Sequence, residues 1–597
     1  MIKLFHFLKP KIWLIIIVFL LIGAQAFSQL SLPRLMGEIV NHITTASVID
    51  SQFIINKGLE MLIYAGITIV IALATSLSVS YVGSYFGKRV RAAVFQKVLS
   101  FSMGDYDRIG TASLITRTTN DVEMVQTVVV MGLRIMVMSP VIMTIAIVQV
   151  LRTDVQLALI LAFSLPLIIL TIVILFSIAM PLFKKIQLAI DDVTKVMRES
   201  LTGVRVVRAF NQEEKEKQRF SKVNGHMTKL ITKVGRTMSF ANPLISIFFD
   251  LTYFGVFVFG FAIIEGTAQT ARLDNILVTS QYAIHIMMSF LMFSMLLINI
   301  PRAGVSAKRI NQVLDTAVFI RDPSDPKDNN AGERGHVIFD DVTFTFPDSK
   351  APTLQNISFE AKPGQVTAII GSTGSGKSSI INLIPRFYDI TAGRILVDGI
   401  DVRDYSQKDL RDKIGFVPQQ ALLFSGTIRD NMKFGKKDGS DEEIQSALEV
   451  AQAARFVAKN ESGIDAEVSQ GGKNFSGGQK QRLAIARALV KKPEIYVFDD
   501  SFSALDFKTD IRLRTALKGY TKFSSVIIVA QRVSSIMDAD NILVLNEGRI
   551  VGQGKHQELL KKCQVYQEIV FSQMDESEIK RTLELKKQVL LTEGGEE

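Results

Sequence analysis

A glycine-rich loop near the middle of the chain has the clearest chemical use. Residues 365–370 predict a β-branched strand, and the pattern G-x-x-x-x-G-K-S follows it directly before a helical run. The glycines let backbone N–H groups wrap phosphates at a helix N-terminus. We expect Lys377 to reach the β- and γ-phosphates of ATP and the Ser378 hydroxyl to bind Mg²⁺. The expected ATP-binding residues here are Gly371, Ser372, Thr373, Gly374, Ser375, Gly376, Lys377, Ser378 and Ser379.

Two adjacent aspartates end a second apolar strand. Residues 495–498 are apolar, and Asp499 and Asp500 follow them. A carboxylate at the C-terminal end of a strand, beside a phosphate loop, is placed to hold Mg²⁺ through water. We assign that role to Asp499.

A third motif offers a second surface for phosphate. Residues 474–482 read N-F-S-G-G-Q-K-Q-R and open a helical run. One nucleotide cannot fill two such sites in one domain, so we expect a second copy of the domain. Each ATP would then lie between the phosphate loop of one copy and this motif of the other. The residues expected to face the partner's ATP are Ser476, Gly477, Gly478 and Gln479.

Six apolar segments precede these motifs. A helix that crosses a bilayer needs about 20 mostly apolar residues. The segments lie at residues 12–33, 61–87, 124–151, 155–183, 237–265 and 275–301. The first nine residues predict a short amphipathic helix on the cytoplasmic face. The long cationic stretches at 88–123 and 184–236 predict helices that run beyond the bilayer.

The net charge of +10 has a distribution typical of a membrane protein. Lys and Arg gather in those two long stretches and are sparse at 34–57, 152–154 and 266–274, which is the positive-inside pattern. We therefore predict an integral protein of the cell membrane with six spans and both termini in the cytosol. Since no basic patch is interleaved with aromatic residues, we expect no nucleic-acid partner.

The composition indicates a membrane part joined to a soluble part. Hydrophobic residues make up 48% and charged residues 21% of the 597 residues, and the mean hydropathy is +0.26. The predicted parts are a transmembrane domain with cytosolic extensions at 1–321, a linker at 322–334, a nucleotide-binding domain at 335–574 and a charged tail at 575–597.

Three polar residues within the spans are candidates for a substrate path. A carboxylate in a membrane helix is costly and usually faces a protein interior or a wet cavity, which singles out Asp250. A purely structural hydrogen bond would explain it as well. Gln281 and His285 on the last span are weaker candidates, for which packing between helices is the alternative.

The motif S-G-G-Q between the phosphate loop and the aspartate pair resembles the signature of ATP-binding-cassette (ABC) proteins. Over nearly its whole length the chain is similar to ABC exporters of the multidrug type. The resemblance implies an α-helical six-span transmembrane domain fused to an α/β P-loop ATPase domain. It also implies a half-transporter that works as a dimer, with ATP and Mg²⁺ as cofactors.

The resemblance assigns further residues. Phe346 matches the aromatic residue that stacks on adenine, and Gln419 matches the glutamine that touches Mg²⁺ and faces the membrane domain. Residues 503–506, with Ser503 and Asp506 at their ends, match the D-loop that crosses the dimer interface. Residues 112–119 and 200–210 look like the coupling helices, which dock on the nucleotide-binding domains.

The sequence departs from the family pattern where hydrolysis takes place. Asp500 stands where the family has the glutamate that acts as general base, and Gln531 replaces the switch histidine. A carboxylate one methylene shorter retreats by about 1.5 Å, a misplacement that can cost ~10²-fold in rate. Glutamine can hydrogen-bond a γ-phosphate but cannot carry a proton as imidazole can. Gln470 and Phe475 are smaller departures beside a nearly regular signature.

These departures predict a heterodimeric exporter. This chain would bind ATP at its own site and hydrolyse it poorly, and a homologous half-transporter with the glutamate and histidine would hydrolyse ATP against this chain's signature. The expected substrates are small hydrophobic or amphipathic compounds, drugs or lipids. Membrane lipids are a further expected partner of the chain. Two alternatives stay open: a slow homodimeric exporter, and an ATP-gated or regulatory subunit that does not pump. The six spans exclude a soluble cassette protein that acts on nucleic acid.

Overall fold

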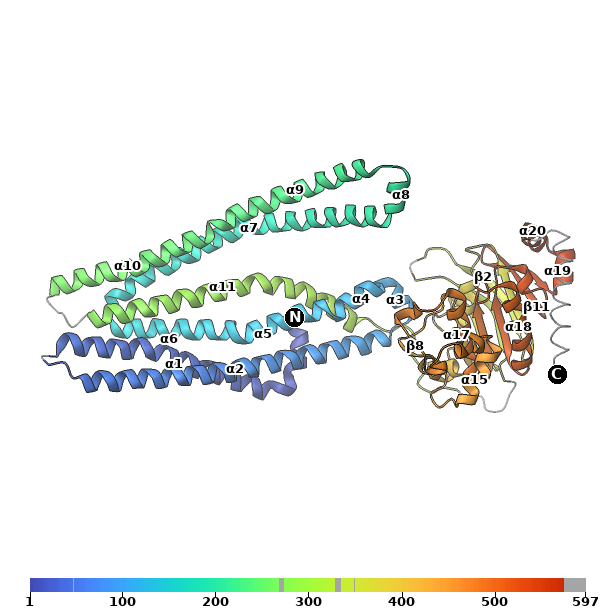
Figure 1. Cartoon of the computed structure of the whole chain (residues 1–597), viewed down its shortest axis with the longest axis horizontal. Helices are drawn as coiled ribbons and strands as arrows, with labels where there is room; N and C mark the ends of the chain where they lie inside the picture. The colour runs from blue at the N-terminus through green and yellow to red at the C-terminus, as the bar shows by residue number, and fades with distance from the viewer. Residues whose placement is uncertain (47, 268–272, 328–333, 348, 574–597) are drawn as a thin grey trace. The chain divides into compact units, whose positions relative to one another are not determined.

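The chain folds into two compact units (Figure 1). The computed structural model describes residues 1–597 except 47, 268–272, 328–333, 348 and 574–597. The helical unit comprises Met1–Val98 and Ala112–Thr316, and the α/β unit comprises Leu99–Thr111 and Ala317–Glu597. The predicted tail and residues 328–333 of the predicted linker lie outside the described residues.

The helical unit contains the predicted spans. Within the described residues, six helical stretches are long and apolar enough to cross a membrane, which confirms the predicted six-span architecture. The helices are η1 (Ile2–Lys11), α1 (Ile12–Thr45), α2 (Ser51–Leu99), α4 (Thr111–Thr118), α5 (Asn120–Met131), η2 (Gly132–Met136), α6 (Val137–Thr153), α7 (Val155–Thr202), α8 (Val204–Ala209), α9 (Glu213–Ser239), α10 (Ala241–Thr267) and α11 (Leu273–Asp315).

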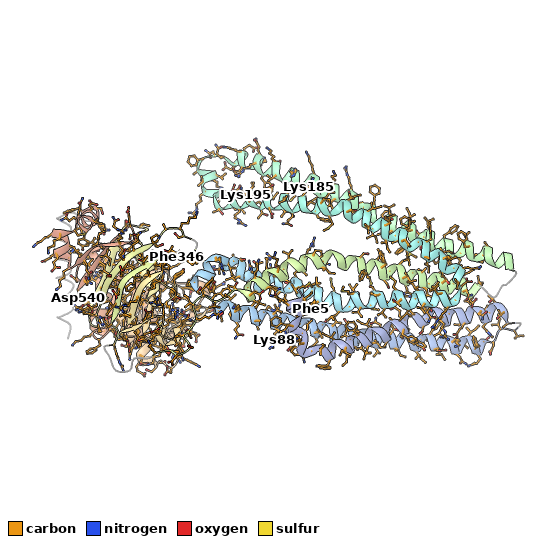
Figure 2. The ribbon with its side chains drawn as sticks, turned by 180° about the vertical axis from the view of Figure 1, so that it is seen from behind. Phe5, Lys88, Lys185, Lys195, Phe346 and Asp540 are labelled. Atoms are coloured by element: carbon orange, nitrogen blue, oxygen red, sulfur yellow. The ribbon has the colours of Figure 1, made fainter. Side chains whose placement is uncertain are left out.

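The N-terminal helix is amphipathic, as predicted, and has 3₁₀ geometry. Leu4 and Leu8 of η1 are buried, whereas Ile2 and Phe5 are exposed (Figure 2). Lys3 on the polar side forms an ion pair of 2.9 Å with Asp315 at the end of α11. The helix therefore joins the first and last spans of the unit at one end.

Two helices are much longer than a bilayer requires. α2 has 49 residues and α7 has 48, about 70 Å each at 1.5 Å per residue, against about 30 Å of hydrocarbon. α9 packs along α7, and the short helix α8 joins them at one end (Figure 1). Lys185 and Lys195 lie on the cationic part of α7, and Lys88 lies on that of α2 (Figure 2). These extensions agree with the predicted long helical stretches.

The α/β unit is built on a mostly parallel sheet. Its strands are β3 (Val366–Gly371), β6 (Ile414–Val417), β9 (Ile495–Asp499), β10 (Ser525–Val529), β11 (Asn541–Asn546) and β12 (Arg549–Gly554). Their spatial order is β12-β11-β3-β10-β9-β6, and only the edge strand β12 runs antiparallel to its neighbour. Successive residues belong to opposite cores: Ile369 and Val497 face one side, Ile370 and Phe498 the other. Burial on both faces explains why these strands read as continuous apolar runs.

A second sheet and a set of helices complete the unit. The second sheet has the order β2-β1-β4-β5, and β7 pairs with β8. The strands are β1 (Val337–Phe344), β2 (Leu354–Ala361), β4 (Ala392–Val397), β5 (Ile400–Asp401), β7 (Gly426–Thr427) and β8 (Glu467–Val468). The helices are α3 (Met103–Ile109), α12 (Lys377–Leu383), α13 (Gln407–Asp412), α14 (Ile428–Lys433), α15 (Asp441–Val450), α16 (Ala454–Ala458), η4 (Gly463–Asp465), η5 (Gln470–Gly472), α17 (Gly477–Val490), α18 (Phe507–Tyr520), η6 (Val533–Ser535), α19 (His556–Lys562) and α20 (Gln564–Gln573).

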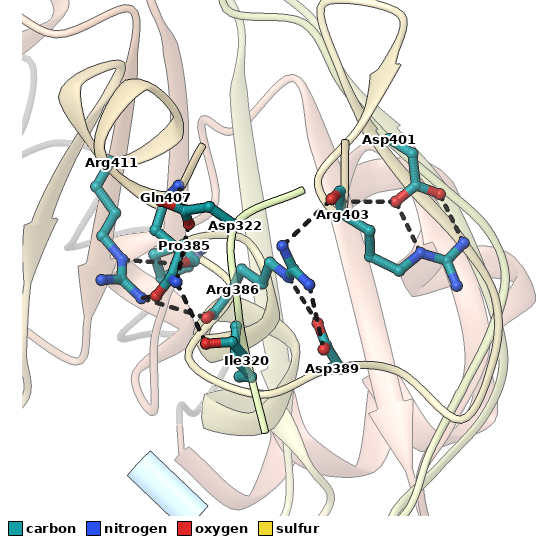
Figure 3. A network of polar contacts seen from close by, with 9 residues as sticks. All are labelled: Ile320, Asp322, Pro385, Arg386, Asp389, Asp401, Arg403, Gln407 and Arg411. Carbon is teal, nitrogen blue, oxygen red and sulfur yellow. Dashed lines mark hydrogen bonds and ion pairs between the residues drawn. The ribbon is translucent and has the colours of Figure 1, made fainter. Parts of the chain in front are cut away.

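A polar network holds the segment that enters this unit (Figure 3). The carboxylate of Asp322 accepts hydrogen bonds from the backbone and the side chain of Gln407, each 3.0 Å long. Nearby, the buried guanidinium of Arg386 forms an ion pair of 2.8 Å with Asp389. Arg386 and Asp389 flank Tyr388 in the sequence, so their ion pair fixes the loop that carries this tyrosine.

Candidate functional site

The phosphate loop has the predicted strand–loop–helix setting. β3 ends at Gly371 and α12 begins at Lys377. Gly374 and Gly376 have φ of +84° and +99°, a left-handed conformation that favours glycine. A methyl group at Gly376 would also lie 2.6 Å from Leu354 Cδ2. The glycine spacing of the motif is therefore required by the backbone of this loop.

Two side chains of the loop are arranged for an anionic ligand. Lys377 Nζ donates hydrogen bonds of 2.8 Å to the carbonyl oxygens of Gly371 and Ser372. Burial lowers the pKa of Lys377, while Asp500 and Asp499 oppose that shift. The Ser375 hydroxyl is buried and has no hydrogen-bond partner within the described residues. A buried polar atom without a partner is costly, and a phosphate oxygen would satisfy it.

The structure joins two of the three predicted Mg²⁺ ligands and places the third against Asp500. Ser378 Oγ donates a hydrogen bond of 3.2 Å to Asp499 Oδ1, and Gln419 Nε2 donates one of 3.3 Å to Asp500 Oδ2. Hydroxyl, carboxylate and amide oxygens are hard donors that suit Mg²⁺, which usually binds through one or two carboxylates plus substrate phosphates. The oxygen atoms of Ser378, Gln419 and Asp499 are therefore a donor set that fits Mg²⁺ delivered with a nucleotide.

Asp500 occupies a constrained position. Its φ is +47°, and its N–H donates a hydrogen bond of 2.9 Å to Val529 O on the neighbouring strand β10. The residue is 8% exposed, and burial raises the pKa of its carboxyl group, which the hydrogen bond from Gln419 opposes. Burial likewise raises the pKa of Asp499. The carboxylate of Asp500 is thus short, buried and already bonded to protein groups.

Gln531 lies beside Asp500 in the loop after β10. Its backbone amide opposes the rise in the pKa of the Asp500 carboxyl group, and its side chain is exposed. Its carbonyl oxygen accepts a hydrogen bond of 2.8 Å from Gln573 Nε2 at the end of α20. Asp500 and Gln531 therefore follow two adjacent parallel strands, β9 and β10.

The signature motif begins α17. Ser476 Oγ accepts from Gln479 N at 3.4 Å, and Gln479 Oε1 accepts from Ser476 N at 2.8 Å, which forms a capping box. Ser476 and Gly477 are exposed, and a methyl group at Gly477 would meet nothing within 4 Å. One at Gly478 would lie 3.1 Å from Ala504 O. The motif is folded, accessible and in contact with the predicted D-loop.

The predicted D-loop connects the aspartate pair to the next helix. Ser503 Oγ donates a hydrogen bond of 2.9 Å to Asp500 O. Asp506 caps α18 by accepting a hydrogen bond of 3.0 Å from Thr509 N. The segment is thereby fixed at both ends.

Phe346 lies in an aromatic group beside α3. Its ring makes edge contacts with Phe344 and Tyr388, with centroids 4.7 Å and 5.2 Å apart. The Tyr388 hydroxyl donates a hydrogen bond of 2.6 Å to Asp107 Oδ2, and burial together with this bond raises the pKa of the phenol. Sequence reasoning missed Tyr388 and Asp107, since neither belongs to a nucleotide motif.

The first predicted coupling segment is wrong in position. The helix that packs against the α/β core is α3 (Met103–Ile109), whereas residues 112–119 belong to the helical unit. A methyl group at Gly104 would lie 3.5 Å from Pro347 Cγ, and Asp105 caps α3 with Ser102. The signal available in the sequence was that capping box, S-M-G-D, which starts a helix before Gly110. The second segment, 200–210, contains α8, and its docking stays a prediction.

The candidate substrate-path residues are dispersed. Asp250 is exposed on α10, Gln281 is exposed on α11, and His285 is half-buried one turn further along α11. No hydrogen bond or ion pair joins Asp250 to either of the others in the described part of the chain. Their role in a path stays a prediction.

Known proteins resemble the chain over most of its length. It matches the family "ABC transporter transmembrane region" over residues 14–298 and the family "ABC transporter" over residues 354–503. An uncharacterised ABC transporter ATP-binding protein of Mycobacterium tuberculosis is 38% identical over 95% of this chain and 97% of its own length. An ATP-dependent lipid A-core flippase of Aromatoleum aromaticum is 30% identical over 94% of this chain and 93% of its own. A solved bacterial Atm1-family ABC exporter with ATP bound has a TM-score of 0.77 at 26% identity, over 96% of this chain and 99% of that one.

Proposed function

The chain belongs to the ABC transporter family as a membrane-embedded transport ATPase, and from that membership we propose that it is one subunit of a heterodimeric exporter. Its own site binds ATP with Mg²⁺ and hydrolyses it poorly. Its signature motif completes the hydrolytic site of a homologous partner. The substrates are hydrophobic or amphipathic compounds, drugs or lipids, and both termini lie in the cytosol.

The observation that carries the proposal is the surroundings of Asp500. The carboxylate is one methylene shorter than the family's glutamate and accepts a hydrogen bond from Gln419. A general base must lie within hydrogen-bond reach of the water it activates, and a retreat of about 1.5 Å removes it from that reach. The adjacent Gln531 cannot accept a proton in place of a histidine. Both groups that would move a proton are therefore weakened at one nucleotide.

The binding residues, in contrast, are suited to hold ATP. The loop amides and Lys377 bind the β- and γ-phosphates, and Phe346 stacks on adenine beside Tyr388. Mg²⁺, when bound by Ser378, Gln419 and Asp499, neutralises charge on the phosphates. Poor hydrolysis with intact binding makes this site a clamp that keeps the two ATPase domains together over several cycles.

The partner's ATP is the one that is hydrolysed. The exposed Ser476 hydroxyl and the amides of Gly477 and Gly478 contact its γ-phosphate, where a helix N-terminus favours negative charge. The partner supplies the glutamate and the histidine. Shifting the membrane domains from 1:99 to 99:1 between two conformations needs about 5.5 kcal/mol of differential binding, which two sandwiched nucleotides can supply.

Similarity to a lipid A-core flippase supports a lipid-like or amphipathic substrate. The apolar composition of the spans agrees with this class. Asp250, Gln281 and His285 contribute polar contacts along the path.

ATP hydrolysis by the purified chain, alone and with a co-expressed partner, tests the proposal. We expect near-background activity alone, restoration by the partner and its loss on Ser476→Ala. Slow hydrolysis by the chain alone that no partner raises would favour the slow homodimer, and rapid hydrolysis by the chain alone would show that Asp500 and Gln531 suffice and reject the asymmetric arrangement. Restored hydrolysis without transport in vesicles would favour a regulatory subunit.

A further inference from the structure

The loop that carries Gln531 is held by the last residue of α20. Gln573 Nε2 donates a hydrogen bond of 2.8 Å to Gln531 O, and Gln573 Oε1 accepts one of 2.9 Å from Val533 N. We propose that Gln573 is a positioning residue that directs the Gln531 side chain toward the γ-phosphate of the ATP bound to this chain. The inference rests on the proposed function in one respect: Gln531 contacts that nucleotide.

The helix that carries Gln573 is a rigid support. Tyr566 and Val570 of α20 are fully buried in the core below the parallel sheet. The Tyr566 hydroxyl also lies 2.7 Å from His556 Nδ1 on α19. Because α20 is fixed by burial, its last side chain meets the loop from a defined direction.

The loop has open space on another side. Ser535, Ile536 and Ala539, which follow it, line a cavity of about 490 Å³ that also borders α18. Val533 and Ile536 are nevertheless buried in the core, and Arg514 donates a hydrogen bond of 2.9 Å to Ser535 O. The two bonds from Gln573 hold the start of the loop, where Gln531 and Arg532 are exposed.

The two hydrogen bonds of Gln573 restrict the Gln531 side chain through the backbone of the loop. One planar amide uses its donor and its acceptor on two peptide groups, at residues 531 and 533, and so fixes their orientation. The peptide group that follows the Cα of Gln531 is therefore held in place, and Gln531 can direct its side chain in fewer ways. Losing the two Gln573 hydrogen bonds gives the Gln531 side chain conformational freedom that nucleotide binding must then remove.

The test measures release of a fluorescent, non-hydrolysable ATP analogue from the full-length chain with Mg²⁺. The non-hydrolysable analogue keeps the result independent of whether this site hydrolyses ATP. We expect Gln573→Ala to raise the release rate about fivefold, the effect of about one lost hydrogen bond. Gln573→Glu keeps the acceptor for Val533 N–H but repels Gln531 O, so we expect it to resemble Gln573→Ala.

Gln567→Ala is the matched control. Gln567 lies on the same helix, and its Nε2 donates a hydrogen bond of 2.6 Å to Leu560 O, far along α20 from the loop. We expect Gln567→Ala to leave the release rate unchanged, even if both variants lower the unfolding temperature equally. Equal release rates for the two variants would overturn the proposal.

A double-mutant cycle separates positioning from general stabilisation. We expect Gln531→Ala to speed release by itself and to abolish the further effect of Gln573→Ala, because no side chain is left to direct. An undiminished effect of Gln573→Ala in the Gln531→Ala background would overturn the positioning role. No effect of Gln531→Ala alone would instead reject the contact between Gln531 and the nucleotide, on which the proposed function depends.

Discussion

The two nucleotide-facing surfaces of the ATPase domain follow the family pattern to different degrees. Around Ser476 the signature is nearly regular, capped by Gln479 and exposed for a partner. Around Asp500 the resemblance to ABC exporters implies that both residues expected to move a proton are replaced, while the phosphate loop beside them has the G-x-x-x-x-G-K-S pattern. We infer that one domain can separate ATP binding from ATP hydrolysis, because the residues for each task lie on different loops.

A change in the signature motif should have the largest effect on ATP hydrolysis. Gly477→Glu introduces a negative charge where the γ-phosphate of the partner's ATP is expected, and a methyl group at this glycine meets nothing within 4 Å in this chain. We expect ATP hydrolysis by the heterodimer to fall by about 10³-fold, as when an electrostatic contact to a transition state is lost.

Gly519→Glu is the control for that variant. Gly519 is also exposed on a helix with open space around it. Steady-state hydrolysis of the co-purified pair should be normal in this control. A mild effect of Gly477→Glu would mean that the signature of this chain does not face a hydrolysed ATP.

A glutamate at 500 together with a histidine at 531 should have the next largest effect on ATP hydrolysis. We expect the double change Asp500→Glu and Gln531→His to raise hydrolysis by this chain alone by about 10²-fold, because the longer carboxylate reaches the water and the imidazole carries a proton. Initial rates of phosphate release would measure it, with the two single changes as references. If the double variant stays at background, the poor hydrolysis has another cause.

A smaller effect concerns transmission to the membrane helices. We expect Tyr388→Phe, which removes the 2.6 Å hydrogen bond to Asp107 on α3, to lower the amount transported per ATP hydrolysed by about fivefold. Tyr405→Phe removes a buried phenol bond to Val397 O away from α3 and should leave this ratio unchanged. An unchanged ratio for Tyr388→Phe would exclude a coupling role for the bond.

The smallest effect concerns stability. Burial raises the pKa of Asp500 above its unfolded value of about 3.9, so the folded state holds the proton more tightly. The resulting loss of stability develops as the pH rises through the folded pKa and is complete at neutral pH. We expect Asp500→Asn to raise the unfolding temperature by about 2 °C at neutral pH and by less near pH 4.

Asp506→Asn is the opposite control for that measurement. Hydrogen bonds from Thr509 lower the pKa of Asp506, so its charge stabilises the folded state at neutral pH. Thermal unfolding without nucleotide should show a lower midpoint for this variant. The same sign for both variants would show that charge burial does not determine the effect at Asp500.

Much of this architecture could be predicted from the sequence because its physical causes are local. Apolar length predicted the six spans, and β-branched runs before Gly371 and Asp499 predicted the strands that carry the nucleotide motifs. The backbone of Gly376 shows why the loop needs glycine.

Contacts between distant segments could not be predicted in the same way. Tyr388 lies 281 positions from Asp107, and Gln573 lies 42 positions from Gln531, and no periodicity or motif relates either pair. The start of α3 is the exception, because the capping box S-M-G-D at residues 102–105 is a local signal for it. Side-chain hydrogen bonds of this kind depend on how the elements pack, which spacing along the chain does not encode.

Following the γ-phosphate of the ATP on each subunit shows which of the two subunits hydrolyses its ATP. The co-expressed pair would be photo-labelled during steady-state turnover with an azido-ATP that carries its radioactive label at the γ-position. We predict that the label stays on this chain and is lost from the partner. Loss from this chain as fast as from the partner would show that Asp500 and Gln531 sustain hydrolysis, and it would contradict the division between a binding surface and a hydrolysing one.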